Sequence, residues 1–209
     1  MFHLLQRFAY EGITPSGNIY CIGQNYVEHI HELKNELPTS PVVFLKAPAA
    51  LRAPSDEGVI AFSEESFHHE VELVLMVGHD EKFTAITLGL DLTRREVQSE
   101  LKKKGLPWSV AKSFAGSALL GHWRPMSSCS SCTSIDFSLS VNGEKKQQGN
   151  SELMIYNFET IRSFLRLHGP LYAGDIVFTG TPAGVGPIKR GDCFTMSSQI
   201  LELQEIGKI

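Results

Sequence analysis

The chain has 209 residues, of which 42% are hydrophobic and 20% are charged, and its formal net charge is −4. This composition is typical of a globular protein with one sizeable core, and we expect a single domain over residues 1–209. The mild negative charge argues against nucleic acid or an anionic membrane as the main partner. No apolar run approaches the roughly 20 residues that span a bilayer, and the N-terminus lacks the apolar core of a secretory signal.

The first half of the chain predicts four strands and two helices. The strands are expected over residues 18–23, 42–47, 69–77 and 84–92. A charged helix over residues 24–35 should end at the prolines of LPTSP. A second helix is expected over residues 93–105, with Thr93 and Glu96 as a capping box and Gly105 after a basic last turn.

The second half adds more strand than helix. Residues 135–149 predict a hairpin that turns at Asn142-Gly143, and residues 151–168 predict a helical region. A strand over residues 175–182 runs into the turn GTPAGVGP, and further strands close the chain. Because strands outnumber helices and hairpins join most of them, we expect a mixed, strand-dominated α+β fold.

Cys129 and Cys132 have the spacing of half a zinc site or of a redox pair. The chain offers no second C-x-x-C or H-x-x-x-H to complete a zinc site. The two cysteines lie in the Ser-rich stretch SSCSSCTS, which indicates a loop. We interpret them as reduced surface thiols of a cytoplasmic protein.

Two glutamates interrupt an otherwise apolar strand. Glu70 and Glu72 lie two residues apart in HHEVELVLMVG, so their side chains point to the same face. Neighbouring carboxylates repel each other and lose hydration when they are buried. An edge strand with a solvated face would explain the pair, but the surrounding apolar residues predict burial on both faces. A divalent cation between the carboxylates would resolve the conflict, because hard cations bind several carboxylate oxygens.

Asp91 is the candidate for a third oxygen ligand. It ends the apolar run AITLGL just before a predicted helix, at a position where a side chain leaves the core and faces a cleft. An ordinary turn residue before a helix is the alternative.

His29 and Glu32 share one face of the first predicted helix, because they lie at i and i+3. A carboxylate can hold a histidine in one tautomer and make it a better base for activating water. An exposed helix rich in His and Glu contains such pairs by chance, and Glu28 with His31 has the same spacing. Spacing alone does not separate a catalytic pair from a solvated helix face.

Four more polar residues could hold an anionic ligand. Arg95 and Gln98 form another i, i+3 pair that could bind a carboxylate or keto oxygen, with a solvated helix face as the alternative. Lys112 is either a surface lysine or a buried cation beside an anion. Thr181 lies in GTPAGVG, whose glycines let the backbone approach a ligand. That stretch matches neither a Walker loop nor G-x-G-x-x-G, and an ordinary tight turn is its alternative.

The order of these motifs is more informative than any one of them. The chain contains, in order, GQNYVEHIHE, VVFLKAP, HHEVEL, LDLTRREVQ, KKKGLPWSVAKSF and TGTPAGVGPIKRGD. In this order they closely resemble the fumarylacetoacetate hydrolase family, and most of all its short single-domain branch with acylpyruvase and oxaloacetate decarboxylase activity. The resemblance covers residues 17 to 195, nearly the whole chain.

The resemblance implies a fold and a role for each candidate residue. The family fold is a mixed β-roll with a few helices, usually dimeric, in which the helix near the His–Glu pair orders as a lid. The residues that match the family's metal ligands, for Mg²⁺ or Mn²⁺, are Glu70, Glu72 and Asp91. Those that match the water-activating pair are His29 and Glu32. Those that match the groups holding the substrate's oxo and carboxylate oxygens are Arg95, Gln98, Lys112 and Thr181.

The implied activity is metal-dependent hydrolysis of acylpyruvates to pyruvate and a carboxylic acid. The 2,4-dioxo acid would bind the metal, Lys112 would help to stabilise the leaving enolate, and His29 with Glu32 would activate water. The same enolate would form when oxaloacetate loses CO₂. Two alternatives stay open: an isomerase or decarboxylase of tricarboxylate-like oxo-acids from aromatic catabolism, and a non-catalytic metal-binding or oligomerisation module.

Two features depart from the family pattern. Arg94-Arg95-Glu96 stands where the family usually has Ala-Arg-Asp, although Arg95 keeps the matching position. The stretch from Gly78 to Asp91 is shorter than expected, and the missing part would be a loop and the start of a strand.

Overall fold

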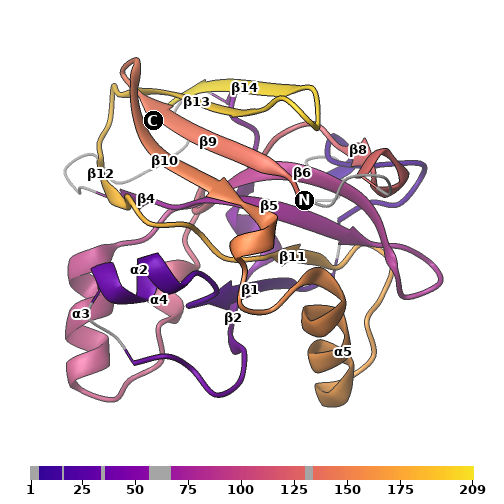
Figure 1. The fold of residues 1–209 in the computed structure, drawn as a ribbon, viewed down its shortest axis with the longest axis horizontal. Coiled ribbons are helices and arrows are strands. Elements are labelled where there is room, and N and C mark those ends of the chain that lie inside the picture. Colours follow the sequence, from indigo (N-terminus) through magenta and orange to yellow (C-terminus); the bar gives the residue numbers. More distant parts are fainter. Residues whose placement is uncertain (1–4, 16, 34–35, 57–66, 130–133) are drawn as a thin grey trace.

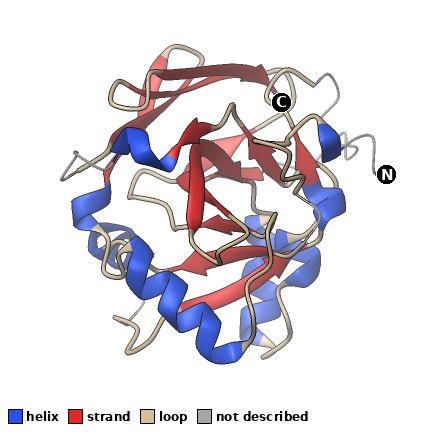
Figure 2. Ribbon diagram, turned by 90° about the vertical axis from the view of Figure 1, so that its right-hand side faces the viewer, coloured by secondary structure: helices blue, strands red, loops and turns tan. Residues whose placement is uncertain are grey.

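The computed structural model describes residues 5–15, 17–33, 36–56, 67–129 and 134–209. Strands make up most of the regular structure, and the helices lie around the outside of them (Figures 1 and 2). The strand-dominated α+β fold is therefore confirmed. The strands are β1 (Ile19–Gly23), β2 (Val42–Lys46), β3 (Leu51–Arg52), β4 (Phe67–His69), β5 (Val71–Val77), β6 (Phe83–Asp91), β7 (Ala118–Leu120), β8 (Arg124–Pro125), β9 (Asp136–Val141), β10 (Glu144–Asn150), β11 (Ile176–Phe178), β12 (Gly186–Ile188), β13 (Cys193–Ser198) and β14 (Leu203–Lys208). The helices are α2 (Val27–Glu32), α3 (Arg95–Lys103), α4 (Ser109–Lys112) and α5 (Phe158–His168), with short 3₁₀ turns η1 (Pro48–Ala50), η2 (Met126–Cys129) and η3 (Ser151–Leu153).

The described strands form three sheets. The largest has the order β2-β1-β11-β5-β6-β7-β3, with β8 beside β6. A four-stranded sheet has the order β10-β9-β13-β14, and β12 pairs with β4. In Figure 1 the four-stranded sheet lies at the top, and α2, α3 and α4 gather at the lower left. Hairpins join β5 to β6, β9 to β10 and β13 to β14, whereas β1 and β11 pair in parallel.

The Asn142-Gly143 turn between β9 and β10 forms as predicted. Both residues have positive φ, 51° and 80°, as a two-residue hairpin turn of this hand requires. A different turn closes the shortened stretch after Gly78. The Gly78 N–H donates to the Lys82 carbonyl at 2.7 Å, so β5 and β6 pair without any longer loop.

The strand β5 is buried at every residue, because sheets or chain segments cover both of its faces. Leu73 and Leu75 belong to a core that includes Phe137 and Met196 of the four-stranded sheet. Val74 faces the other way, into a second core with Phe178 and Phe8 among its members. The solvated edge strand that could have explained Glu70 and Glu72 is thus excluded.

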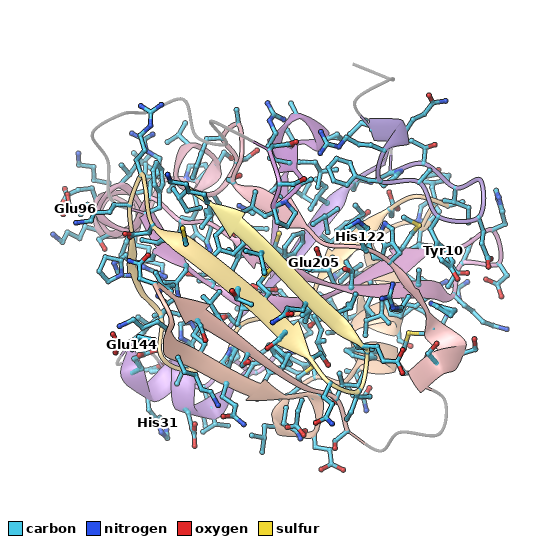
Figure 3. All side chains as sticks on the ribbon, turned by 90° about the horizontal axis from the view of Figure 1, so that it is seen from above. Tyr10, His31, Glu96, His122, Glu144 and Glu205 are labelled. Atoms are coloured by element: carbon cyan, nitrogen blue, oxygen red, sulfur yellow. The ribbon has the colours of Figure 1, made fainter. Side chains whose placement is uncertain are left out.

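The predicted capping box at Thr93 is wrong. The helix α3 begins two residues later, Arg94 is its N-cap, and no side chain caps it. Thr93 is instead buried and pairs with His68 as an antiparallel bridge, in which the His68 N–H donates to the Thr93 carbonyl at 2.8 Å. Its hydroxyl accepts from Lys112 Nζ at 2.6 Å, while Glu96 lies exposed at the margin of the molecule (Figure 3).

Two helical predictions were too long. The helix expected over residues 24–35 is the six-residue α2, because Gln24 has a left-handed φ of 58° and Asn25 is fully buried as an anchor. Residues 34–35 lie outside the described part. The region 151–168 divides into η3 and α5. The proposed surface thiols also fall outside, since residue 132 and the side chain of residue 129 are not described.

Within the described residues, no helix combines the length and the apolarity that crossing a bilayer requires.

Candidate active site

The hairpin β5–β6 brings three carboxylates together. Glu72 pairs with Gly89 across the hairpin, and the Asp91 N–H donates to the Glu70 carbonyl at 2.9 Å, so Asp91 lies opposite Glu70. Strand alternation then points all three side chains to one face. One oxygen from each carboxylate lies within 4.8 Å of the others, and all three residues are buried.

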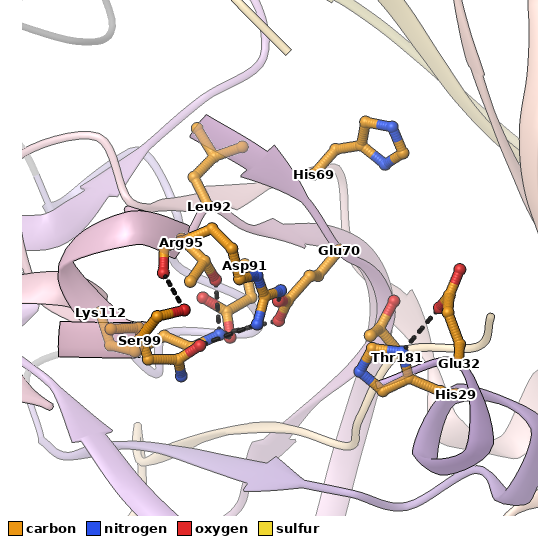
Figure 4. A network of polar contacts seen from close by, with 12 residues as sticks. His29, Glu32, His69, Glu70, Asp91, Leu92, Arg95, Ser99, Lys112 and Thr181 are labelled. Atoms are coloured by element: carbon orange, nitrogen blue, oxygen red, sulfur yellow. Dashed lines mark hydrogen bonds and ion pairs between the residues drawn. The ribbon is translucent and has the colours of Figure 1, made fainter. Parts of the chain in front are cut away.

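A buried lysine and a partly buried arginine form ion pairs with two of these carboxylates. Lys112 Nζ lies 2.7 Å from both Glu70 Oε2 and Asp91 Oδ2, and Arg95 Nη2 forms an ion pair with Glu70 Oε1 (Figure 4). Lys112 is only 4% exposed, which decides between its two predicted roles: it is a buried cation beside anions. It sits at the end of α4, so this short helix sets its position.

The charges hold Glu70 and Lys112 in their ionised forms. Burial by itself would raise the pKa of Glu70, but the positive charges of Lys112 and Arg95 lower that pKa below the usual range. Burial would likewise lower the pKa of Lys112, but Asp91 and Glu70 raise it overall. Lys112 is therefore a fixed positive charge at neutral pH rather than a base.

Glu72 is the carboxylate that lacks a cation. Its Oε2 accepts from the Gly180 N–H at 2.6 Å, and among the described residues it forms no ion pair. Burial, followed by the negative charges of Asp91 and Glu70, raises the pKa of Glu72 well above its ordinary value. Three converging carboxylates, one of them uncompensated, fit a hard divalent cation such as Mg²⁺ or Mn²⁺.

Sequence reasoning missed Lys46, which completes the charge network. Its side chain is fully buried, and Nζ lies 2.7 Å from Asp91 Oδ1. Nζ also donates to the carbonyls of Lys112 and Leu92. A lysine that ends the apolar strand VVFLK was the available signal, because a buried lysine requires a buried anion.

The structure distinguishes the His29–Glu32 pair from the Glu28–His31 pair, which has the same spacing. His29 is buried, and its Nδ1 lies 3.2 Å from Glu32 Oε2, whereas Glu28 and His31 are exposed (Figures 3 and 4). Glu32 Oε1 accepts from the Gly184 N–H at 3.1 Å, which ties α2 to the turn after β11. This contact fixes the carboxylate that orients His29.

The other predicted site residues lie beside the three carboxylates. Arg95 Nη1 donates to Gln98 Oε1 at 2.8 Å, as the i, i+3 spacing predicts. Arg95 Nε is buried and has no hydrogen-bond partner among the described residues, so it can donate to a ligand oxygen. One cleft is lined by all the predicted site residues except Glu32, namely His29, Glu70, Glu72, Asp91, Arg95, Gln98, Lys112 and Thr181.

Two buried amides that sequence reasoning missed hold the backbone around this cleft. Asn25 Nδ2 donates to the Thr179 carbonyl at 2.8 Å, and its Oδ1 accepts from the Tyr156 N–H at 2.7 Å. Asn25 thereby joins the start of α2 to the end of β11. Gln147, on β10, contacts Thr181 from the four-stranded sheet. No local sequence pattern marks either residue.

Comparison with known proteins points to one family. The mitochondrial oxaloacetate tautomerase FAHD1 of Homo sapiens is 37% identical over 187 residues, which is 84% of each chain. The oxaloacetate tautomerase YcgM of Escherichia coli is 38% identical over 201 residues, 88% of this chain and 89% of that protein. Tautomerisation was not among the activities that the sequence motifs led us to expect.

A solved structure agrees with the sequence relatives. Fumarylpyruvate hydrolase from Pseudomonas aeruginosa, crystallised in complex with Mn²⁺ and pyruvate, superposes with a TM-score of 0.84 at 29% identity, over 93% of this chain and 90% of that one. Residues 18–209 also match the family described as fumarylacetoacetate (FAA) hydrolase C-terminal. The fold and the resemblance read from the motifs are thus both confirmed, and the chain belongs to the fumarylacetoacetate hydrolase family.

Proposed function

We propose that this protein is a metal-dependent enzyme that acts on small 2-oxo acids by stabilising an enolate. Oxaloacetate tautomerisation is the first candidate activity, because relatives that are 35–38% identical carry that name. Oxaloacetate decarboxylation draws on the same enolate. Hydrolysis of acylpyruvates is the second candidate, favoured by the His29–Glu32 pair and by the fumarylpyruvate hydrolase neighbour.

The observation that supports the proposal most strongly is that two functional groups share one cleft. Glu70 and Asp91 lie on one side with Lys112 and Arg95, and His29 and Thr181 lie on the other, with Glu32 behind His29 (Figure 4). Glu72 converges with Glu70 and Asp91. Enolate chemistry needs one half that can hold a metal ion and anionic oxygens, and one half that can transfer a proton.

Each half has a definable task. When bound by Glu70, Glu72 and Asp91, Mg²⁺ or Mn²⁺ supplies a Lewis acid for the oxygens of a 2-oxo acid. Lys112, permanently charged, stabilises negative charge on the enolate oxygen. Arg95 and Gln98 orient the substrate carboxylate through the free Nε and the amide. His29, oriented by Glu32, takes a proton from carbon when the enol forms and returns it when the ketone forms, and in hydrolysis it takes a proton from water.

The test follows three reactions with chelator-stripped protein before and after Mg²⁺ or Mn²⁺ is added. They are enol-to-keto conversion of oxaloacetate, CO₂ release from oxaloacetate, and acetylpyruvate hydrolysis, each corrected for the uncatalysed rate. Metal-dependent turnover of any of them supports the proposal, and the ratio of kcat/KM values ranks the activities. Metal binding with no turnover on all three would contradict it and would favour the isomerase branch or a non-catalytic module.

His29→Ala should separate the reactions. We expect kcat for tautomerisation and hydrolysis to fall by about 10²- to 10⁴-fold, because both need a base. Decarboxylation should lose less, since the departure of CO₂ creates the enolate without proton removal. His31→Ala, on the exposed face of the same helix, is the matched control and should leave all rates unchanged. Equal losses in all three reactions would show that His29 positions the site instead of moving a proton.

A homodimer and a cytoplasmic location are further proposals. The first rests on the resemblance, and the second rests on the interpretation of Cys129 and Cys132 as reduced thiols. Light scattering of the purified protein tests the first, and fractionation of cells that express the chain tests the second.

A further inference from the structure

We propose that Gln147 is a positioning residue that holds the turn at residues 180–184 in its active geometry. Gln147 lies outside the cleft and on the other sheet, and no sequence motif marked it. The proposal rests on the proposed function, because it concerns how that same site is assembled. Its support comes from hydrogen bonding, burial and backbone geometry.

The Gln147 side chain makes the full set of hydrogen bonds that an amide can make. Oε1 accepts from the Val71 N–H at 3.0 Å and from His69 Nδ1 at 3.0 Å. Nε2 donates to Thr181 Oγ1 at 2.8 Å and to the Pro182 carbonyl at 2.9 Å. The backbone partners fix which end of the amide is oxygen, because an N–H must donate and a carbonyl must accept. Gln147 is 1% exposed, so none of these bonds is shared with bulk water.

A β-bulge brings Gln147 to this position. The register of β10 shifts between Lys145 and Gln147, which leaves Lys146 as the extra residue. The shift turns Gln147 inward within a run of exposed polar residues. The Lys146 carbonyl also packs against the turn, where a Cβ on Gly184 would lie only 2.2 Å from it. The four-stranded sheet thus supports the turn through one side chain and one backbone contact.

The turn that Gln147 holds serves both halves of the active site. The Gly180 N–H donates to Glu72, a candidate metal ligand, at 2.6 Å. The Gly184 N–H donates to Glu32, which orients His29, at 3.1 Å. Because Thr181 and Pro182 lie between these two glycines, a shift of the turn would disturb the metal side and the proton-transfer side together.

Gln147 also sets the polarity of the Thr181 hydroxyl. Thr181 Oγ1 donates its proton to the Val71 carbonyl at 2.9 Å and accepts from Gln147. Its proton and one lone pair are therefore committed, and the remaining lone pair can only accept. While this network holds, Thr181 offers the cleft an acceptor, so it suits a ligand O–H, as in an enol, better than a carboxylate oxygen.

The decisive variant is Gln147→Glu, which keeps the shape and both accepted bonds but removes the two donated bonds. Gln147→Met removes all four, and Gln148→Met, at the exposed neighbouring position, is the matched control. We expect both Gln147 variants to raise the KM for oxaloacetate and the Kd for Mn²⁺ together, lowering kcat/KM by about 10- to 100-fold, as loss of supporting contacts around a metal site usually does. The control should match the wild type.

A lower Tm with unchanged KM and Mn²⁺ affinity would overturn the proposal, since Gln147 would then be merely structural. Wild-type constants in Gln147→Glu would overturn it as well. If neither variant folds, NMR of the wild-type Gln147 amide decides: adding Mg²⁺ and oxalate should shift both Nε2 proton signals, and no shift would contradict the proposal. If the wild type turns over neither oxaloacetate nor acetylpyruvate, the proposed function fails, and the Mn²⁺ affinities still test Gln147.

Discussion

Glu72→Gln should abolish metal-dependent turnover and make the metal-free protein more stable at neutral pH. Loss of a ligand oxygen should lower Mn²⁺ affinity and kcat/KM by at least about 100-fold, the upper end of what supporting residues cost. The gain in stability arises because glutamine keeps an acceptor for the Gly180 N–H and removes a buried negative charge beside Asp91 and Glu70.

The stability gain should depend on pH in a defined direction. The pKa of Glu72 is raised in the folded state above its ordinary value of 4.5, so folding favours the protonated form. The stability that Glu72 contributes is fully present below pH 4.5 and is lost as pH rises through the raised pKa. The Tm of Glu72→Gln should therefore match the wild type near pH 4.5 and exceed it increasingly toward pH 8.

The Tm values are measured by thermal unfolding of chelator-treated proteins across this pH range. Isothermal titration measures the affinity for Mn²⁺. Glu144→Gln, which removes an exposed glutamate, serves as the control (Figure 3). Wild-type metal affinity in Glu72→Gln would refute the assignment of Glu72 as a ligand. A pH-independent difference in Tm would show that the carboxyl is not the group responsible.

Lys46→Met should cause the largest loss of stability of any variant considered. Asp91 would keep Lys112 but lose the cation at Oδ1, and the carbonyls of Lys112 and Leu92 would lose a donor. Breaking one side of a buried ion pair costs about 3–5 kcal/mol of unfolding free energy. Because Asp91 would also move, turnover should fall in the part of the population that remains folded.

Urea unfolding measures the difference in unfolding free energy between Lys46→Met and the wild type. The matched control is Lys82→Met, because Lys82 pairs with Asp80 at 3.6 Å with both side chains more than 60% exposed. Surface pairs of this kind contribute at most about 1 kcal/mol, so the control should be nearly neutral. Similar losses in both variants would mean that Lys46 does not compensate Asp91.

Much of this molecule could be predicted from its sequence because the signals are local. The period of the strands, the Asn142-Gly143 turn and the i, i+3 pair of Arg95 and Gln98 need only neighbouring residues. The meeting of Glu70, Glu72 and Asp91 also follows from one hairpin whose register the apolar pattern sets.

The errors and omissions concern residues whose partners lie far along the chain. Thr93 has the sequence of a helix cap, but its pairing with His68 and its bond to Lys112 prevail. Gln147 is one polar residue among several in EKKQQG, and only a bulge buries it. Lys46 and Asn25 are also buried polar residues whose partners are distant in the sequence. Lys46 pairs with Asp91, and Asn25 forms hydrogen bonds with the backbone of Thr179 and Tyr156.

The parallel pairing of β1 with β11 has a consequence for how the protein is made. It joins residues 19–21 to residues 176–178, so the α2 half of the site meets Gly180 and Thr181 only after residues 176–181 have been synthesised. The β5–β6 hairpin, which carries Glu70, Glu72 and Asp91, is synthesised earlier than β11, the strand that pairs with β5. Such long-range pairing slows folding. A nascent chain therefore carries the candidate metal ligands Glu70, Glu72 and Asp91 before the residues that complete the proposed site have been synthesised.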